Sequence, residues 1–179
     1  MEKIVLSGAP GSGKTSVITE LEQRGYRVEH EVIRDYTAKL LEEKTGTYEN
    51  PLEALDDPIP FNRDLLNARL EVLQQTRHTP CFFDRGTVDV LGYMKHFNQD
   101  YPTYFEELCR EHRYTHVFYF EPWEKIYIPD STRLETFKSV LHINKALQQA
   151  YSYFGYTPVV VPQLSVRERA DFILNTINL

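Results

Sequence analysis

One short segment near the amino end, GAPGSGKT at positions 8–15, limits the possible folds of this chain more than any other. It has the form G-x-x-x-x-G-K-[ST] and directly follows an apolar run at 3–6 that is typical of a buried strand. Glycine permits backbone conformations that other residues avoid, so successive N–H groups can turn inward and surround a phosphate chain. A strand, this loop and a following helix therefore predict a site for a nucleoside triphosphate.

Each part of this phosphate loop has an expected role. We expect Lys14 to reach the β- and γ-phosphates and Thr15 to place its hydroxyl on Mg²⁺, while the helix that begins near Gly13 directs its positive dipole at the anion. The predicted cofactors are ATP and magnesium. The alternative is a glycine-rich turn that happens to carry a lysine. The residues expected to contact the nucleotide are Gly8, Ala9, Pro10, Gly11, Ser12, Gly13, Lys14, Thr15 and Ser16.

Length and charge argue against several other classes of protein. The 179 residues suffice for one three-layer domain but not for two, so a single domain over 1–179 is expected. A net charge of −6 argues against binding to nucleic acid or to an anionic membrane, although a local cationic pocket is compatible with it. No apolar run approaches the roughly 20 residues that span a bilayer, and no leader segment precedes the first strand, so a cytoplasmic protein is expected. Cys81 and Cys109 lack metal-ligand spacing and are expected to be buried thiols.

Strand and helix patterns alternate along the chain. Strands are predicted at 3–6, 26–31, 80–84, 115–120 and 157–161. Helices are predicted at 15–24, 32–43, 61–77, 87–97, 104–111, 133–153 and 167–177, the last capped by Ser165 with Glu168 at the capping-box spacing. Prolines break the pattern between 47 and 60, where we expect a loop. Helical crossovers between parallel strands predict an α/β fold with a five-stranded parallel sheet and helices on both faces.

Polar residues follow four of the predicted strands. In an open α/β sheet, ligands bind beyond the carboxyl ends of the strands, so we expect these residues on the edge that carries the phosphate loop. They are Glu31 and Arg34 after the second strand, Asp84 and Arg85 after the third, Glu121 after the fourth and Gln163 after the fifth.

Two of these residues, Asp84 and Arg85, form the second candidate constellation. Asp84 has the position of a carboxylate that holds Mg²⁺ through water or accepts a proton from an attacking hydroxyl, with a helix N-cap as the alternative. Arg85 is a candidate for clamping phosphate, or for pairing with a nearby acid in solvent. Glu31 is a candidate for binding a substrate hydroxyl or for serving as an alternative base, and Arg34 is a candidate substrate residue. A surface role is the alternative for both.

The irregular segment at about 121–135 is a candidate lid over the triphosphate. A closing movement would bring Arg133 to the transferred group as an arginine finger. The alternative is an exposed Arg133 in the first turn of a helix capped by Asp130 or Ser131. Three aromatic residues are candidates for stacking on a base or a substrate ring, with a place in the core as the alternative: Tyr36, Trp123 and Tyr127.

With these motifs in view, the chain resembles the P-loop kinase-like proteins, and in particular the NadR-like AAA-domain ATPases, a group placed with ribosylnicotinamide kinase domains. The resemblance implies a three-layer P-loop NTPase fold with strand order 2-3-1-4-5, and adenine lying near Pro162 and Gln163. The segments that carry it span nearly the whole chain: GAPGSGKTS from Gly8, EVIRDY from Glu31, FFDRG from Phe82, DSTRLET from Asp130 and VVVPQLSVRERADFIL from Val159.

Deoxynucleoside and thymidylate kinases are similar in carrying an acid–arginine pair after the third strand. That similarity implies that Asp84 is the base or metal residue, that Arg85 is a phosphate or substrate ligand, and that Arg133 has the lid position. The short segment with one central arginine departs from nucleoside monophosphate kinases, which commonly use several, and this puts a monophosphate acceptor in doubt. We therefore expect an ATP- and Mg²⁺-dependent phosphotransferase acting on a small hydroxyl-bearing, nucleoside-like acceptor. An ATPase or nucleotide-dependent switch, and a binding module with little turnover, are the alternatives.

Overall fold

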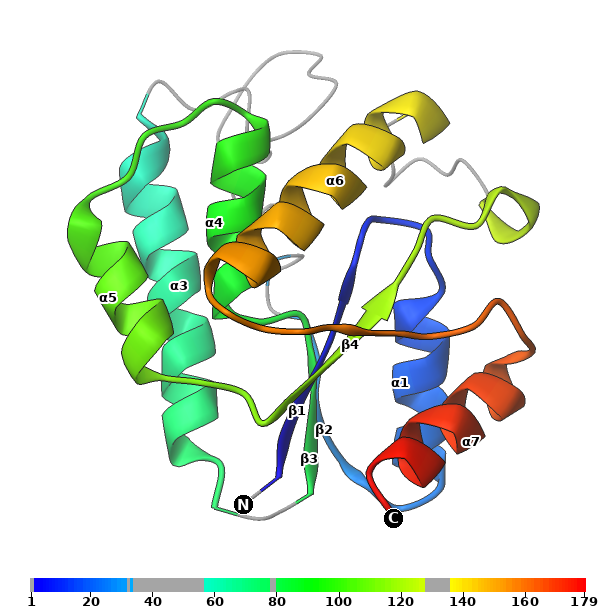
Figure 1. Cartoon of the computed structure of the whole chain (residues 1–179). Coiled ribbons are helices and arrows are strands. Elements are labelled where there is room, and N and C mark those ends of the chain that lie inside the picture. The colour runs from blue at the N-terminus through cyan, green and yellow to red at the C-terminus, as the bar shows by residue number, and fades with distance from the viewer. Residues whose placement is uncertain (1, 32, 34–56, 78–79, 128–135) are drawn as a thin grey trace.

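A parallel sheet forms the centre of the computed structural model, which describes residues 2–31, 33, 57–77, 80–127 and 136–179 (Figure 1). The expected strand order is confirmed: the five strands lie in the order β2-β3-β1-β4-β5. Their bounds are β1 (Lys3–Gly8), β2 (Arg27–Glu29), β3 (Cys81–Asp84), β4 (His116–Phe120) and β5 (Val159–Val160). In the register, Leu6 pairs with Asp84 and Gly8 pairs with Phe120, so the start of the phosphate loop and the end of β3 lie at the same edge.

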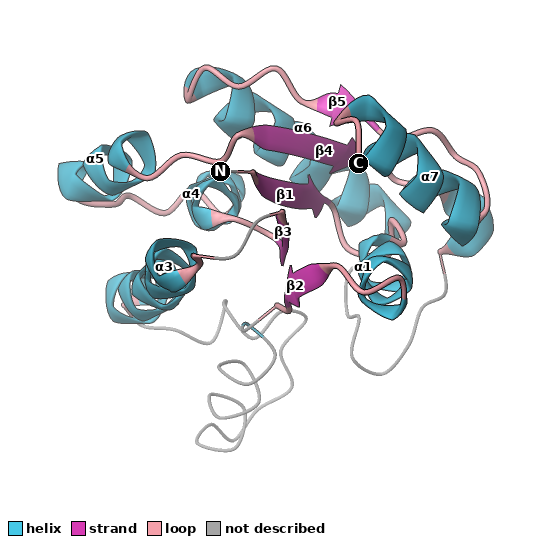
Figure 2. Ribbon diagram, turned by 90° about the horizontal axis from the view of Figure 1, so that it is seen from below, coloured by secondary structure: helices cyan, strands magenta, loops and turns pink. Residues whose placement is uncertain are grey.

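Helices cover both faces of this sheet, as predicted (Figures 1 and 2). On one face lie α1 (Lys14–Gln23) and α7 (Val166–Thr176). On the other lie α3 (Pro58–Gln75), α4 (Thr87–His96) and α6 (Phe137–Tyr153), with α5 (Thr103–Glu111) beside α4. A short 3₁₀ helix, η2 (Glu124–Ile126), follows β4. No helix in the described part of the chain is long and apolar enough to cross a membrane.

The central strand β1 shows why both faces need a cover. Val5 belongs to the core under α3 and α4, whereas Ile4 and Leu6 belong to the core under α1 and α7. Successive side chains of a strand point to opposite faces, so a strand buried on both sides is apolar throughout. Cys81 and Cys109 lie in the first of these cores, and burial raises the pKa of Cys81 to about 11 and that of Cys109 to about 12. The prediction of buried thiols is confirmed.

Two predicted helix starts were wrong, both because a cap lies elsewhere. Helix α3 begins at Pro58 rather than at position 61, since the Asp57 side chain accepts a hydrogen bond from the backbone N–H of Ile59 at 3.0 Å. Proline fits this first turn because its missing N–H would have no helical partner there. Helix α6 begins at Phe137 rather than at 133, and Thr136 is its N-cap. Asp130 and Ser131, the predicted caps, lie outside the described residues.

The other described helices agree with their predicted ends to within one residue. The capping box on α7 is confirmed, because Ser165 and Glu168 exchange hydrogen bonds between side chain and backbone. The edge strands β2 and β5 are shorter than predicted, since each pairs with a neighbour on one side only. The helix predicted at 32–43 lies outside the described residues, apart from Ile33.

Candidate functional site

The phosphate loop has the glycine conformations that its sequence predicts. Gly8, Gly11 and Gly13 have φ values of +141°, +72° and +85°, in the region that favours glycine. A Cβ atom on Gly8 would lie 2.2 Å from the carbonyl oxygen of Phe120, so the pairing of β1 with β4 excludes any side chain there. Gly13 is the N-cap of α1 and has no side chain that could cap the helix. The first amides of α1 are therefore left for an anion.

The ammonium group of Lys14 lies inside the loop. Its Nζ donates to the carbonyl oxygens of Gly8 at 2.7 Å and Ala9 at 2.8 Å, and to Oγ of Ser12 at 3.1 Å. Burial lowers the pKa of Lys14 to about 7, and the positive charge of Arg85 acts in the same direction. The loop thus places a buried cation where phosphate oxygens are expected.

This lowered pKa gives a pH dependence of stability. The ordinary pKa of the Lys14 ammonium is 10.5, and it falls to about 7 in the fold, so between these values the unfolded chain binds more protons. The contribution of Lys14 therefore rises with pH from about 7 towards 10.5 and is least favourable below 7. We expect urea unfolding of the wild type to show this rise and Lys14→Met to lack it. Equal pH slopes in the two proteins would contradict the burial of a charged Lys14.

Asp84 is a buried carboxylate with an unused oxygen. Its exposed fraction is 5%, and Oδ1 has no hydrogen-bond partner among the described residues. Burial raises the pKa of Asp84 and the charge of Glu31 raises it further, whereas Lys14 and Arg85 act in the opposite direction. The N-cap of α4 is Gly86, so the alternative reading of Asp84 as the cap was wrong.

Arg85 contacts both Glu31 and the phosphate loop. Its φ of +69° is unusual for a residue with a side chain, and its backbone N–H donates to the carbonyl oxygen of Leu6 at 3.0 Å. The guanidinium lies 2.6 Å from Oε1 of Glu31 through Nε and donates to the carbonyl oxygen of Gly8 at 3.1 Å through Nη1. The pairing with an acid is observed, but the pair is buried rather than solvated.

Sequence reasoning missed the second arginine on Glu31. Arg69 of α3 is buried, lies 3.3 Å from Oε1 of Glu31 through Nη2, and donates to the carbonyl oxygen of Gly86 at 2.8 Å through Nη1. Glu31 is 15% exposed, so its reading as a surface residue was wrong. One signal could have found Arg69: it is a charged residue at a position of α3 that the apolar period assigns to the core.

Asp89, also missed, holds the turn after β3 in place. It is fully buried and accepts hydrogen bonds from Oγ of Ser7 at 2.7 Å, from the hydroxyl of Tyr151 at 2.6 Å and from the backbone N–H of Gly86 at 2.8 Å. These bonds tie the turn to β1 and to α6. They support the left-handed conformation of Arg85, which costs about 1–3 kcal/mol by itself.

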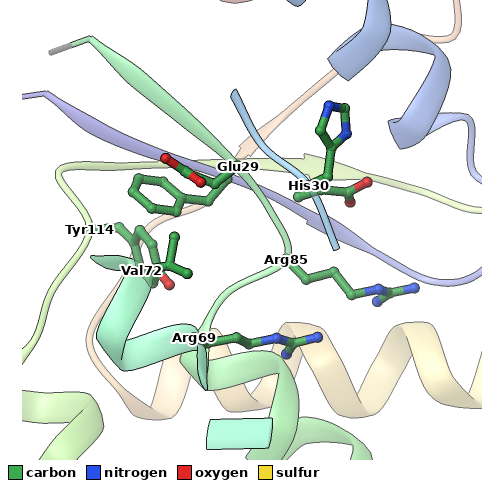
Figure 3. A pocket seen from close by; sticks show the side chains of 8 residues that line it. Glu29, His30, Arg69, Val72, Arg85 and Tyr114 are labelled. Carbon is green, nitrogen blue, oxygen red and sulfur yellow. The ribbon is translucent and has the colours of Figure 1, made fainter. Parts of the chain in front are cut away.

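A pocket opens beside Asp84 and Arg85, at the carboxyl ends of β2 and β3. The side chains of Arg69 and Arg85 extend in the same direction along it, one from α3 and the other from the turn after β3 (Figure 3). The pocket therefore brings two guanidinium groups and two carboxylates to the same edge of the sheet as the phosphate loop. Its lining residues are Glu29, His30, Arg69, Val72, Phe83, Asp84, Arg85 and Tyr114.

The remaining candidates lie apart from this pocket or outside the described residues. Gln163 is exposed and donates to the carbonyl oxygen of Pro122 at 3.2 Å, which joins the loops after β4 and β5. Tyr127 packs against the core of α6 and contacts Phe137, so its core alternative is supported. Thr15 and Ser16 are exposed at the start of α1, and Glu121 is exposed after β4. Arg34, Tyr36 and Arg133 lie outside the described residues.

Magnesium fits the oxygen atoms available here. The described residues contain no group of three or more His, Cys, Asp or Glu side chains that could hold a metal ion. Mg²⁺ in nucleotide sites is usually held by one or two protein oxygens together with phosphate oxygens and water. The free Oδ1 of buried Asp84 and the hydroxyl of exposed Thr15 could supply such oxygens.

The family comparison agrees with this geometry. A family model described as an AAA domain matches residues 3–169, which is most of the chain. The chain belongs to this AAA domain family. The described part of this AAA domain has a P-loop NTPase fold, and it resembles a NadR protein in fold. Among curated protein sequences, none matches the chain.

Solved structures resemble this AAA domain along nearly its whole length. Deoxyadenosine kinase from M. mycoides, with products dCMP and dCDP bound, has a TM-score of 0.71 at 21% identity and covers 98% of each chain. A NadR protein in complex with NR has a TM-score of 0.73 at 12% identity and covers 99% of this chain and 50% of the NadR chain. Thymidylate kinase from Ehrlichia chaffeensis has a TM-score of 0.62 at 11% identity and covers 98% of each chain.

Proposed function

We propose that this AAA domain is an ATP-dependent phosphotransferase that moves the γ-phosphate to a hydroxyl group of a small, nucleoside-like acceptor. Magnesium accompanies the ATP. We also propose that residues 1–179 form a single catalytic domain.

One observation carries this proposal: a single buried carboxylate borders both the phosphate loop and a pocket. Asp84 pairs with Leu6 at the entrance to the loop, and its charge acts on Lys14. It also lines the pocket that Arg69 and Arg85 border. A simple ATP-binding module has no use for a polar pocket beside this carboxylate, whereas a transferase needs a place for the acceptor.

The proposed reaction assigns a task to each group. The acceptor hydroxyl attacks the γ-phosphorus, its O–P bond forms as the bond to the leaving ADP oxygen breaks, and its proton passes to Asp84. The raised pKa makes this carboxylate a stronger base than an ordinary aspartate. Lys14 and Arg85 neutralise the charge on the transferred group, because positioning and electrostatics supply most of the catalysis in phosphoryl transfer. Magnesium, when bound, neutralises the β- and γ-phosphate oxygens.

The similar structures support a nucleoside-like acceptor. Two of them are named as kinases of a nucleoside or a nucleotide, and one of these holds dCMP and dCDP. The carboxyl edge of the sheet, where ligands of open α/β sheets bind, is also where this chain has its phosphate loop and its pocket, which supports the same site.

A label-transfer assay tests the proposal. Purified protein with Mg²⁺ and ATP labelled in the γ-phosphate is offered a panel of ribonucleosides, deoxynucleosides and nucleoside monophosphates. We expect label on at least one nucleoside, and none when EDTA removes the metal. Release of labelled phosphate to water without transfer to any acceptor would mean an ATPase. ATP binding without either reaction would mean a binding module. Either result would overturn the proposed transferase.

A further inference from the structure

Arg169 of α7 contacts the phosphate loop at Ser12 and Gly13. Its exposed fraction is 4%, and its Nη1 donates to the carbonyl oxygen of Ser12 at 3.3 Å. A Cβ atom on Gly13 would lie 2.6 Å from the same nitrogen, so the guanidinium is pressed against the start of α1. The guanidinium carbon Cζ of Arg169 lies 5.7 Å from the centre of the Trp123 ring and 5.9 Å from the centre of the Phe120 ring.

This guanidinium has no acidic partner in the described part of the chain. No described carboxylate forms an ion pair with Arg169, and its Nε is buried without a hydrogen-bond partner among the described residues. Burial lowers the pKa of Arg169, yet a guanidinium remains charged in proteins. Three buried or half-buried acids lie near the other cations instead: Glu31, Asp84 and Asp89.

The position is unfavourable for a second reason. The amino end of a helix carries a partial positive charge, and Arg169 lies beside Gly13, the N-cap of α1. Contacts with the two aromatic rings offset only part of the cost of a buried, unpaired cation. An anion at this place would satisfy the guanidinium and the helix end together. The phosphate loop is where such an anion is expected.

We propose that Arg169 is a nucleotide-binding residue whose guanidinium binds the phosphate chain of the donor nucleotide, a proposal that rests on the ATP-dependent function above. The Nε of Arg169, which has no hydrogen-bond partner within the described ranges, and its Nη1, whose bond to Ser12 is long, would donate hydrogen bonds to phosphate oxygens. Arg169 thereby adds a third cation to Lys14 and Arg85, from the side of α7 rather than from the sheet edge.

Trp123 makes this contact measurable without an activity assay. It is the single tryptophan of the chain, and the guanidinium lies beside its ring. A phosphate that draws the cation towards itself changes the surroundings of the indole. Nucleotide binding is therefore expected to change the intrinsic fluorescence.

The test is a titration of the full chain with ATP, ADP, tripolyphosphate and adenosine, followed by tryptophan fluorescence and calorimetry. We expect Arg169→Met to weaken the binding of ATP, ADP and tripolyphosphate by about 10- to 100-fold, because one charge-assisted hydrogen bond to phosphate is lost. Adenosine affinity should stay unchanged. Arg167→Met is the matched control, because Arg167 is an exposed arginine on the same helix, and its affinities should equal those of the wild type.

Other outcomes separate the inference from the proposed function. Unchanged ATP affinity in Arg169→Met, or an equal loss for ATP and adenosine, would overturn the phosphate contact while leaving the transferase proposal intact. A wild type that binds neither ATP nor ADP would overturn both. A wild type that binds ATP through Arg169 but transfers no label would overturn the function alone. If Arg169→Met does not fold, Arg169→Gln, which keeps a donor for Ser12, should show the same selective loss, and full ATP affinity in it would overturn the inference.

Discussion

Replacement of Lys14 by alanine is expected to weaken ATP binding at least about a hundredfold. The ammonium lies inside the loop, within 3 Å of two carbonyl oxygens that border the phosphate position. Two charge-assisted hydrogen bonds to phosphate oxygens, each worth about 1.5–3 kcal/mol, would be lost together. Calorimetric titration with ATP and Mg²⁺ gives the change directly.

The control for this substitution is Lys145→Ala. Lys145 is an exposed lysine on α6, so its removal changes the net charge equally without altering the loop. Wild-type affinity is expected in that variant. If Lys14→Ala binds ATP as tightly as the wild type, the site proposed here is wrong, whatever the rate of catalysis.

Asp84→Asn is expected to lower the rate of transfer by about 10²- to 10⁴-fold while leaving ATP affinity largely unchanged. The amide keeps the size of the carboxylate but cannot accept the acceptor's proton, and general base catalysis contributes about that factor. Measurement of kcat and of ATP binding in the same preparation separates the two effects. Asp100→Asn, an exposed change between α4 and α5, is the matched control and should keep the full rate.

The variant Glu31→Gln tests whether Glu31 or Asp84 accepts the proton. Glu31 is held by two arginines, through contacts of 2.6 Å and 3.3 Å, so it is expected to position Arg85 rather than to react. Glu31→Gln should then impair the rate less than Asp84→Asn. A full rate in Asp84→Asn with a strong loss in Glu31→Gln would transfer the role of base to Glu31.

The sheet and the phosphate loop could be predicted because their signals are local. An apolar run, three glycines and a lysine lie within a dozen neighbouring positions, and the register then brings Asp84 to the same edge. Helix ends were less certain, since several polar residues in a row can cap a helix. Thr136 rather than Ser131 begins α6, and no local pattern separates them.

The polar contacts could not be predicted because they join distant parts of the chain. Arg69 and Glu31 are 38 positions apart, and Tyr151 and Asp89 are 62 apart. Which polar side chains form contacts depends on how the folded sheet brings these distant segments together. A partial signal existed in α3 and α7, where Arg69 and Arg169 interrupt largely apolar faces. A charge on such a face needs either a buried counter-charge or a ligand.

The hydrogen bonds of Lys14 within the phosphate loop affect the free energy of nucleotide binding. Its ammonium is already stripped of water and held by Gly8, Ala9 and Ser12 before any nucleotide arrives. The dehydration penalty therefore belongs to folding, and an incoming triphosphate exchanges carbonyl partners for phosphate oxygens instead of dehydrating a lysine afresh. The arriving anion also favours the protonated amine. Capture above neutral pH should therefore draw protons from the buffer, with an uptake that varies with pH around 7.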